Sequence, residues 1–146
     1  MTPAGHAYQG APVGFDLDMT LIDSRRVILA SFAAVSDATG VPIDPAAVDR
    51  RLGIKLEDEL GFWFPAEQVP AAVRVYREHY LRLAGPLTSA LPGAREALAA
   101  VKAAGARAVV ITAKYEMTAR APAARTAASA SRAPGSTLVS GPASRR

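Results

Sequence analysis

Two aspartates, Asp16 and Asp18, follow a short apolar run in the stretch VGFDLDMT. If a strand ends there, the chain turns and both carboxylates can face one pocket. One carboxylate can then attack as a nucleophile, while the other donates a proton to the leaving group and afterwards activates water. Two carboxylates that meet an anionic substrate call for a hard divalent cation such as Mg²⁺. The chain has no cysteine and two histidines, so oxygen ligands are expected.

A purely structural interpretation of this stretch is also available. Acidic residues after a strand often cap the helix that follows, and Asp23 or Ser24 can begin the next helix in this way. Thr20 lies two positions after Asp18, and a second apolar run ends in Thr112. Together these residues favour catalysis over capping for the Asp16 and Asp18 pair.

Helical patterns dominate the region after the aspartates. Ile28, Phe32 and Val35 repeat at helical spacing before Gly40, a typical helix end. Asp44 followed by Pro45 is a cap and first-turn signature for a second, short helix. Beyond it, apolar residues spaced three and four apart predict a brief helix and then a longer one. Residues 25–85 are therefore predicted to be almost wholly helical.

A second strand follows this helical region. The sequence predicts a helix from Pro92 to Gly105 and then, in ARAVVITAK, a buried strand ending in Thr112. Two strands joined through a helix favour a parallel βαβ unit. The predicted fold class is α/β, with a partial Rossmann-like parallel sheet core (13–24 and 86–116) and an inserted all-helical cap subdomain (25–85).

The two ends of the chain differ from this core in composition. Residues 1–12 are rich in Gly, Ala and Pro and are expected to form a flexible leader. The segment 117–146 is almost entirely small or polar, with five arginines and no acidic residue, and is expected to be a disordered, low-complexity tail. Because the tail has no aromatic residue to stack on a base, nucleic-acid binding is not expected.

Length and composition limit the classes of protein. A chain of 146 residues suits one compact domain with its own core, or a small core with an appended subdomain. No apolar run approaches the ~20 residues that span a bilayer, and the N-terminus shows no secretory signal pattern. We therefore expect a cytoplasmic protein without a membrane segment.

The motifs also resemble a known family. FDLDMTLIDS is similar to the Asp-x-Asp-x-Thr motif of the haloacid dehalogenase superfamily, and VVITAK to its second motif, a strand ending in Thr or Ser. The helical insert and the approach LPGAREALAAVKAAG resemble the phosphoglycolate-phosphatase-like branch with a helical cap. The resemblance spans roughly residues 13–116. It implies Mg²⁺-dependent hydrolysis of a small phosphorylated metabolite through an aspartyl-phosphate intermediate.

Site residues are carried over position by position. The resemblance implies that Asp16 is the nucleophile and a Mg²⁺ ligand, and that Asp18 is the general acid/base with its backbone carbonyl on the metal. The amides of Leu17 and Asp18 would cradle the phosphoryl group, and Thr112 would donate a hydrogen bond to it. Lys114, just after the second motif, would meet the substrate phosphate.

Two departures from the family pattern bear on these roles. Met19 stands where phosphatases of the family usually have Gly, a change that is tolerated if the backbone there is not left-handed. The family's later motifs, a Lys and one or two metal-binding acids, have no counterpart beyond Lys114 and Glu116. We expect a chain truncated after the second motif, with weakened Mg²⁺ binding.

Two further interpretations follow from these departures. One is a non-catalytic remnant or binding module in which the helical cap is the stable part. The other concerns assembly: two parallel strands leave both sheet edges bare, so a homo-oligomer could complete the sheet.

Overall fold

The computed structural model describes residues 9–112 and 137–140, which fall into two compact units. The first, here called the sheet unit, comprises the described residues before Ser24 and after Thr88. The second, the helical unit, is Ser24–Thr88. Each unit is described on its own below.

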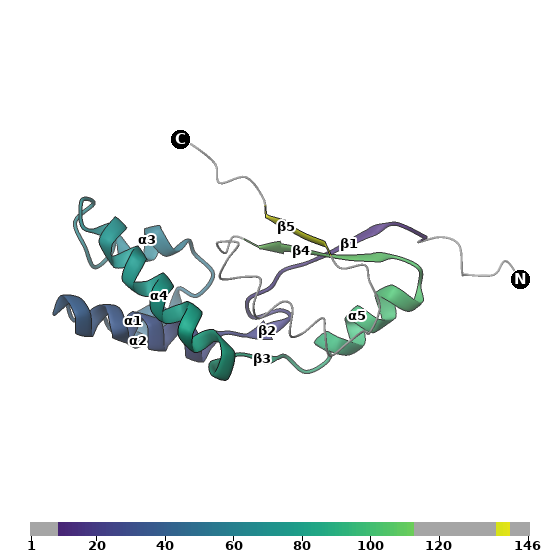
Figure 1. Ribbon diagram of the computed structural model, residues 1–146, viewed down its shortest axis with the longest axis horizontal. Helices are drawn as coiled ribbons and strands as arrows, with labels where there is room; N and C mark the ends of the chain where they lie inside the picture. The colour runs from purple at the N-terminus through teal and green to yellow at the C-terminus, as the bar shows by residue number, and fades with distance from the viewer. Residues whose placement is uncertain (1–8, 113–136, 141–146) are drawn as a thin grey trace, which may run out of the picture. The chain divides into compact units, whose positions relative to one another are not determined.

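The sheet unit contains a three-stranded parallel sheet in the order β1-β4-β5 (Figure 1). These strands span Pro12–Phe15, Arg107–Thr112 and Thr137–Ser140. Phe15 pairs with Val110, and Thr112 pairs with Ser140. The helix α5, Ala94–Ala103, precedes β4 and packs Leu98 into a cluster with Phe15 and Val110. The predicted α/β class with a parallel core is confirmed.

The strand β5 was not predicted. It lies within a segment of low complexity, where only Leu138 and Val139 are candidates for a core. A four-residue strand carries too short an alternating pattern to be recognised, and its pairing with β4 is non-local. Residues 117–136 and 141–146 of the expected tail, residues 113–116 of the expected core and residues 1–8 of the expected leader lie outside the described residues.

The burial of β4 differs from the prediction. The sequence predicts a buried strand, yet each residue of β4 is half-buried or exposed, and Ile111 is 60% exposed. α5 packs on the face that carries Val110. On the opposite face, the residues that the structure describes do not bury Ile111. A parallel strand with apolar residues on both faces needs a cover on each face, and within residues 9–112 and 137–140 one such cover, α5, is described.

A small antiparallel pair lies at the boundaries between the units. β2 (Ile22–Asp23) pairs with β3 (Ser89–Ala90), and Asp23 is opposite Ser89. Elements of two residues are too short to leave a periodic signal in the sequence. The chain enters and leaves the helical unit next to this pair.

The helical unit consists of α1 (Arg25–Thr39), α2 (Pro45–Arg50), α3 (Leu56–Leu60) and α4 (Val69–Leu87). α1 ends at Gly40, whose φ of 72° is left-handed as predicted for a helix stop. Asp44 caps α2 by accepting hydrogen bonds from the amides of Ala46 and Ala47 at 2.9 and 3.2 Å. Of the two candidate caps, Asp23 and Ser24, the structure places Ser24 at the N-cap of α1, but the Ser24 side chain makes no capping hydrogen bond.

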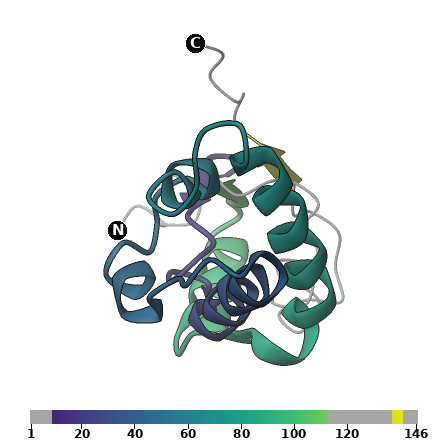
Figure 2. The ribbon, with the colours of Figure 1, turned by 90° about the vertical axis from the view of Figure 1, so that its left-hand side faces the viewer.

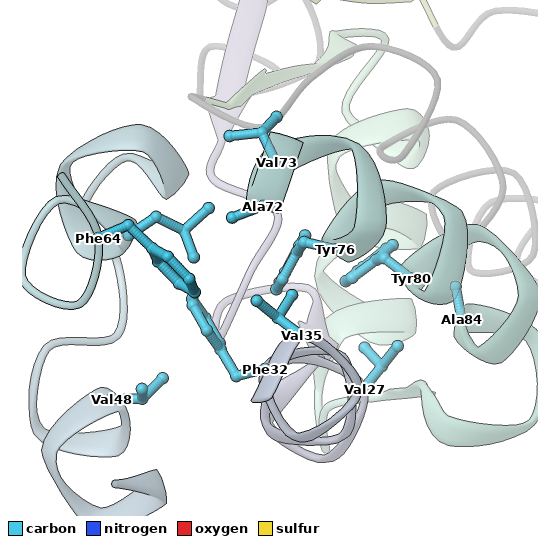
Figure 3. Close-up of a cluster of buried hydrophobic side chains, with 11 residues drawn as sticks. Val27, Phe32, Val35, Val48, Phe64, Ala72, Val73, Tyr76, Tyr80 and Ala84 are labelled. Carbon is cyan, nitrogen blue, oxygen red and sulfur yellow. The ribbon is translucent and has the colours of Figure 1, made fainter. Parts of the chain in front are cut away.

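The core of the helical unit lies between α1 and α4, which Figure 2 shows side by side. Their apolar side chains point toward one another (Figure 3). The rings of Phe32 and Tyr76 have centroids 4.9 Å apart, and those of Tyr76 and Tyr80 are 5.9 Å apart. Eleven buried residues form this cluster: Val27, Phe32, Val35, Val48, Leu60, Phe64, Ala72, Val73, Tyr76, Tyr80 and Ala84. Among the described helices, none is long and apolar enough to cross a membrane.

Candidate functional site

The strands β1 and β4 end side by side, at the carboxyl-terminal edge of the sheet. The strands are parallel neighbours with Phe15 opposite Val110, so Asp16, which follows β1, and Thr112, which ends β4, come to the same edge. In open parallel sheets this edge is where ligands bind. Asp16 is exposed, whereas Asp18 and Thr112 are half-buried. The structure therefore places the two aspartates and the threonine at one edge, as the motif order implies.

A tight turn holds the two aspartates. The carbonyl of Leu17 accepts hydrogen bonds from the amides of Thr20, Leu21 and Ile22, at 3.4, 3.0 and 3.1 Å. The amide of Met19 donates to the carbonyl of Ile22 at 2.8 Å. The Leu17 side chain, 0% exposed, anchors the turn in a cluster with Leu21, Ile22 and Ala94. Because Leu17 is the buried member, the aspartates on either side of it in sequence stay nearer to solvent.

The backbone at Met19 is left-handed. Its φ is 58°, whereas Met was expected to be tolerated in place of Gly only if the backbone at this position is not left-handed. A left-handed backbone costs an L-residue with a side chain roughly 1–2 kcal/mol. The hydrogen bonds of the turn impose this conformation, and the Met19 side chain remains 46% exposed. The sequence held a sign of this conformation, because related phosphatases usually have Gly at this position and Gly is favoured where φ is positive.

Lys114 lies outside the described residues, so its predicted contact with phosphate stays a prediction. The roles of Asp16, Leu17, Asp18 and Thr112 also stay predictions. Their positions at one sheet edge are the structural support for those roles.

The donors near this edge are compatible with Mg²⁺. The Asp16 carboxylate and the Asp18 carbonyl are hard oxygen donors, and Mg²⁺ is often held by one or two carboxylates together with waters and substrate phosphates. Within the described part of the chain, no group of three or more acidic, histidine or cysteine residues could hold a metal ion. The chemistry of the donors fits Mg²⁺, but these few donors would bind it weakly without substrate.

A buried carboxylate with three side-chain hydrogen bonds lies in the helical unit. Glu59, 4% exposed, accepts two hydrogen bonds from the Arg51 guanidinium, at 2.8 and 2.6 Å, and one from the indole nitrogen of Trp63 at 3.0 Å. The hydrogen bond to Glu59 raises the pKa of Arg51. The guanidinium also lies 4.5 Å from the centre of the Phe62 ring. This cluster joins the end of α2 to α3, which is a structural role.

Comparison with known proteins adds to this geometry. Residues 13–125 match the family model described as haloacid dehalogenase-like hydrolase. The chain is 32% identical over 117 residues to a phosphoglycolate phosphatase of Caulobacter vibrioides, a match that covers 75% of this chain and 49% of that protein. It is 33% identical over 107 residues to the tyrosine-protein kinase PtkA of Mycobacterium tuberculosis, covering 73% of this chain and 37% of the kinase.

Solved structures show the same fold. The structure of PtkA from Mycobacterium tuberculosis matches with a TM-score of 0.75 at 27% identity, covering 95% of this chain and 64% of the other. A predicted phosphatase from Clostridium acetobutylicum matches with a TM-score of 0.75 at 21% identity, covering 90% of this chain and 61% of the other. The chain thus spans less than two thirds of each of these relatives.

Proposed function

The chain belongs to the haloacid dehalogenase-like hydrolase family, and we propose that it is a Mg²⁺-dependent phosphatase of a small phosphorylated metabolite. The observation that carries the proposal is the parallel register of β1 and β4, which brings Asp16, Asp18 and Thr112 to one edge of the sheet. The name of the Caulobacter relative, a phosphoglycolate phosphatase, supports the reaction class.

In the first step, a carboxylate oxygen of Asp16 attacks the phosphorus of the monoester. The phosphorus–oxygen bond to the organic group breaks, and the leaving oxygen takes a proton from the Asp18 carboxyl group. The products of this step are the free alcohol and a phosphorylated Asp16. Exposure of Asp16 allows the substrate to reach it, while the half-buried Asp18 is held in the turn beside it.

In the second step, the Asp18 carboxylate accepts a proton from water, which attacks the phosphorus. The bond between phosphorus and the Asp16 oxygen breaks, so inorganic phosphate leaves and both aspartates return to their starting states. Thr112 and the amides of Leu17 and Asp18 would orient the phosphoryl oxygens. Mg²⁺, held by the Asp16 carboxylate and the Asp18 carbonyl, would supply positive charge that offsets the charge of the phosphoryl group.

The test is a phosphatase assay on the purified chain. We expect hydrolysis of p-nitrophenyl phosphate that requires Mg²⁺ and is abolished by EDTA. Asp16→Asn should lower kcat by at least ~10³-fold, because an amide is a poor nucleophile and the covalent route is lost. Released p-nitrophenol, followed by absorbance, measures the rate.

The matched control is Asp37→Asn, which removes an exposed carboxylate of α1 in the helical unit. Its rate should equal that of the unmodified chain. Mg²⁺-dependent turnover that persists in Asp16→Asn would overturn the nucleophile assignment. No Mg²⁺-dependent turnover in the unmodified chain would instead favour a non-catalytic binding module.

A further inference from the structure

Met19 combines a strained backbone with an exposed apolar side chain. Among the described residues it alone has a positive φ without being glycine. Its amide is tied to the Ile22 carbonyl at 2.8 Å, so the turn fixes the left-handed conformation. Glycine would satisfy the same turn without steric cost. Neither the turn nor its hydrogen bonds need a side chain at this position.

Within the described part of the sheet unit, packing does not account for the Met19 side chain either. The buried cluster under the turn is formed by Leu17, Leu21, Ile22 and Ala94, and Met19 does not belong to it. The residue is 46% exposed, so a large apolar group faces solvent immediately after Asp18. Strain of this kind, retained without benefit to the core, is concentrated at functional sites.

We propose that Met19 contacts the organic group of the substrate and makes the site selective for phosphate monoesters whose organic group is apolar or aromatic. This inference rests on the proposed function. Asp18 would donate its proton to the leaving oxygen, so the organic group attached to that oxygen must lie near Asp18 and its neighbour Met19. A flexible, polarizable thioether adapts to irregular apolar surfaces and interacts favourably with aromatic rings.

The first test compares two substrates in the full chain, p-nitrophenyl phosphate and 2-phosphoglycolate. The measured quantity is the ratio of their kcat/KM values. Met19→Gly removes the proposed contact and relaxes the backbone, so the ratio should shift about 5–10-fold toward phosphoglycolate. Met19→Leu keeps an apolar side chain of similar volume and should hold the ratio within about twofold. Urea denaturation of both variants checks that they are folded.

The second test does not depend on turnover. The chain carries three methionines, Met1, Met19 and Met117, whose methyl groups can be labelled with ¹³C. Met19→Leu identifies the Met19 resonance by its loss. Phenylphosphonate added with Mg²⁺ should shift this resonance, because the ring current of a phenyl group acts on a methyl group in contact with it. Methylphosphonate should leave it in place, and the Met1 and Met117 resonances serve as internal controls.

The outcomes separate the inference from the function on which it rests. If phenylphosphonate binds, as calorimetry would show, and the Met19 resonance does not move, the inference is wrong and the phosphatase proposal stands. A substrate ratio unchanged in Met19→Gly leads to the same conclusion. If neither phosphonate binds in the presence of Mg²⁺, both proposals fail.

Discussion

Among the residues that the structure describes, the helical unit and the sheet unit differ in how completely they bury their apolar residues. In the helical unit, facing residues of α1 and α4 form a continuous cluster, and Tyr80 and Val35 are fully buried. In the sheet unit, the buried cluster contains Leu17, Leu21, Ile22 and Ala94, and no residue of β4 is fully buried. Helices can bury their apolar stripes against each other, whereas a parallel sheet needs a cover on each face.

The candidate site lies in the sheet unit, where burial among the described residues is the less complete. The aspartates lie in the unit with the smaller buried cluster, and the Arg51 and Glu59 ion pair lies in the unit with the larger one. We therefore expect the helical unit to be the more resistant of the two to denaturation. The predictions below test that difference, beginning with the largest expected effect, and each of the larger effects is paired with a change that is expected to cost less.

The largest effect is expected for Tyr80→Ala. Removing a fully buried aromatic ring should lower the free energy of unfolding of the helical unit by about 3–5 kcal/mol. Trp63 is the single tryptophan and belongs to this unit, so its fluorescence during urea denaturation measures the effect. Leu81→Ala, at a neighbouring position that is 42% exposed, should cost less than about 0.5 kcal/mol.

The counterpart in the sheet unit is Val110→Ala. Since Val110 is only half-buried, the expected cost is about 1 kcal/mol, measured by hydrogen exchange of the β4 amides. A cost equal to that of Tyr80→Ala would contradict the difference between the units.

An intermediate effect is expected for Glu59→Ala. The change leaves Arg51 and the Trp63 indole without their shared acceptor. Because the Arg51 side chain is 31% exposed and can regain water, we expect a loss of about 2 kcal/mol rather than the full cost of a broken buried pair. Thermal denaturation followed by circular dichroism measures it.

Glu57→Ala is the matched control for Glu59→Ala. Glu57 also pairs with an arginine, Arg77, at 2.9 Å, but its side chain is 52% exposed. Exposed pairs contribute little and are screened by salt, so the expected loss is below about 0.5 kcal/mol. Equal losses in the two variants would show that burial of Glu59 does not matter.

A small effect is also expected for Gly14→Ala in β1. An added Cβ would lie 2.7 Å from Cδ1 of Ile111, which is too close. The neighbour is the end of a flexible side chain that is 60% exposed, so Ile111 can rotate away and the cost should stay below about 0.5 kcal/mol. Adding Ile111→Ala should remove even this cost, as a double-mutant cycle by thermal denaturation would detect. A loss above 2 kcal/mol would mean that this sheet face is tightly packed.

The sequence predicted features that depend on local signals. Gly40 and the Asp44–Pro45 pair marked helix boundaries correctly, because caps and left-handed stops are determined by a few neighbouring residues. The α/β class followed from the order of strands and helices. The parallel pairing of β1 and β4 then placed Asp16 and Thr112 at one edge, as their motif order implied.

Features that depend on distant residues were not predictable in the same way. The burial of β4 depends on what covers each face, and the position of β5 depends on an available edge of β4. The sequence shows Met19 at a position where Gly is usual, but only the structure reveals that the backbone there is left-handed. Ser24 has a typical N-cap identity, yet its hydroxyl does not cap α1, and its backbone (φ −106°, ψ 2°) is not in the extended conformation typical of a capping residue.

The antiparallel pairing of Asp23 with Ser89 has a consequence for how the chain folds. It brings together the two points between which the helical unit, a segment of about 65 residues, is inserted. Closing an unstructured loop of that length rather than one of four residues would cost about 2.5 kcal/mol in chain entropy. A helical unit that folds first holds its own ends in place and thereby removes most of this cost. For the sheet unit, the entire insertion then acts as a short hairpin loop.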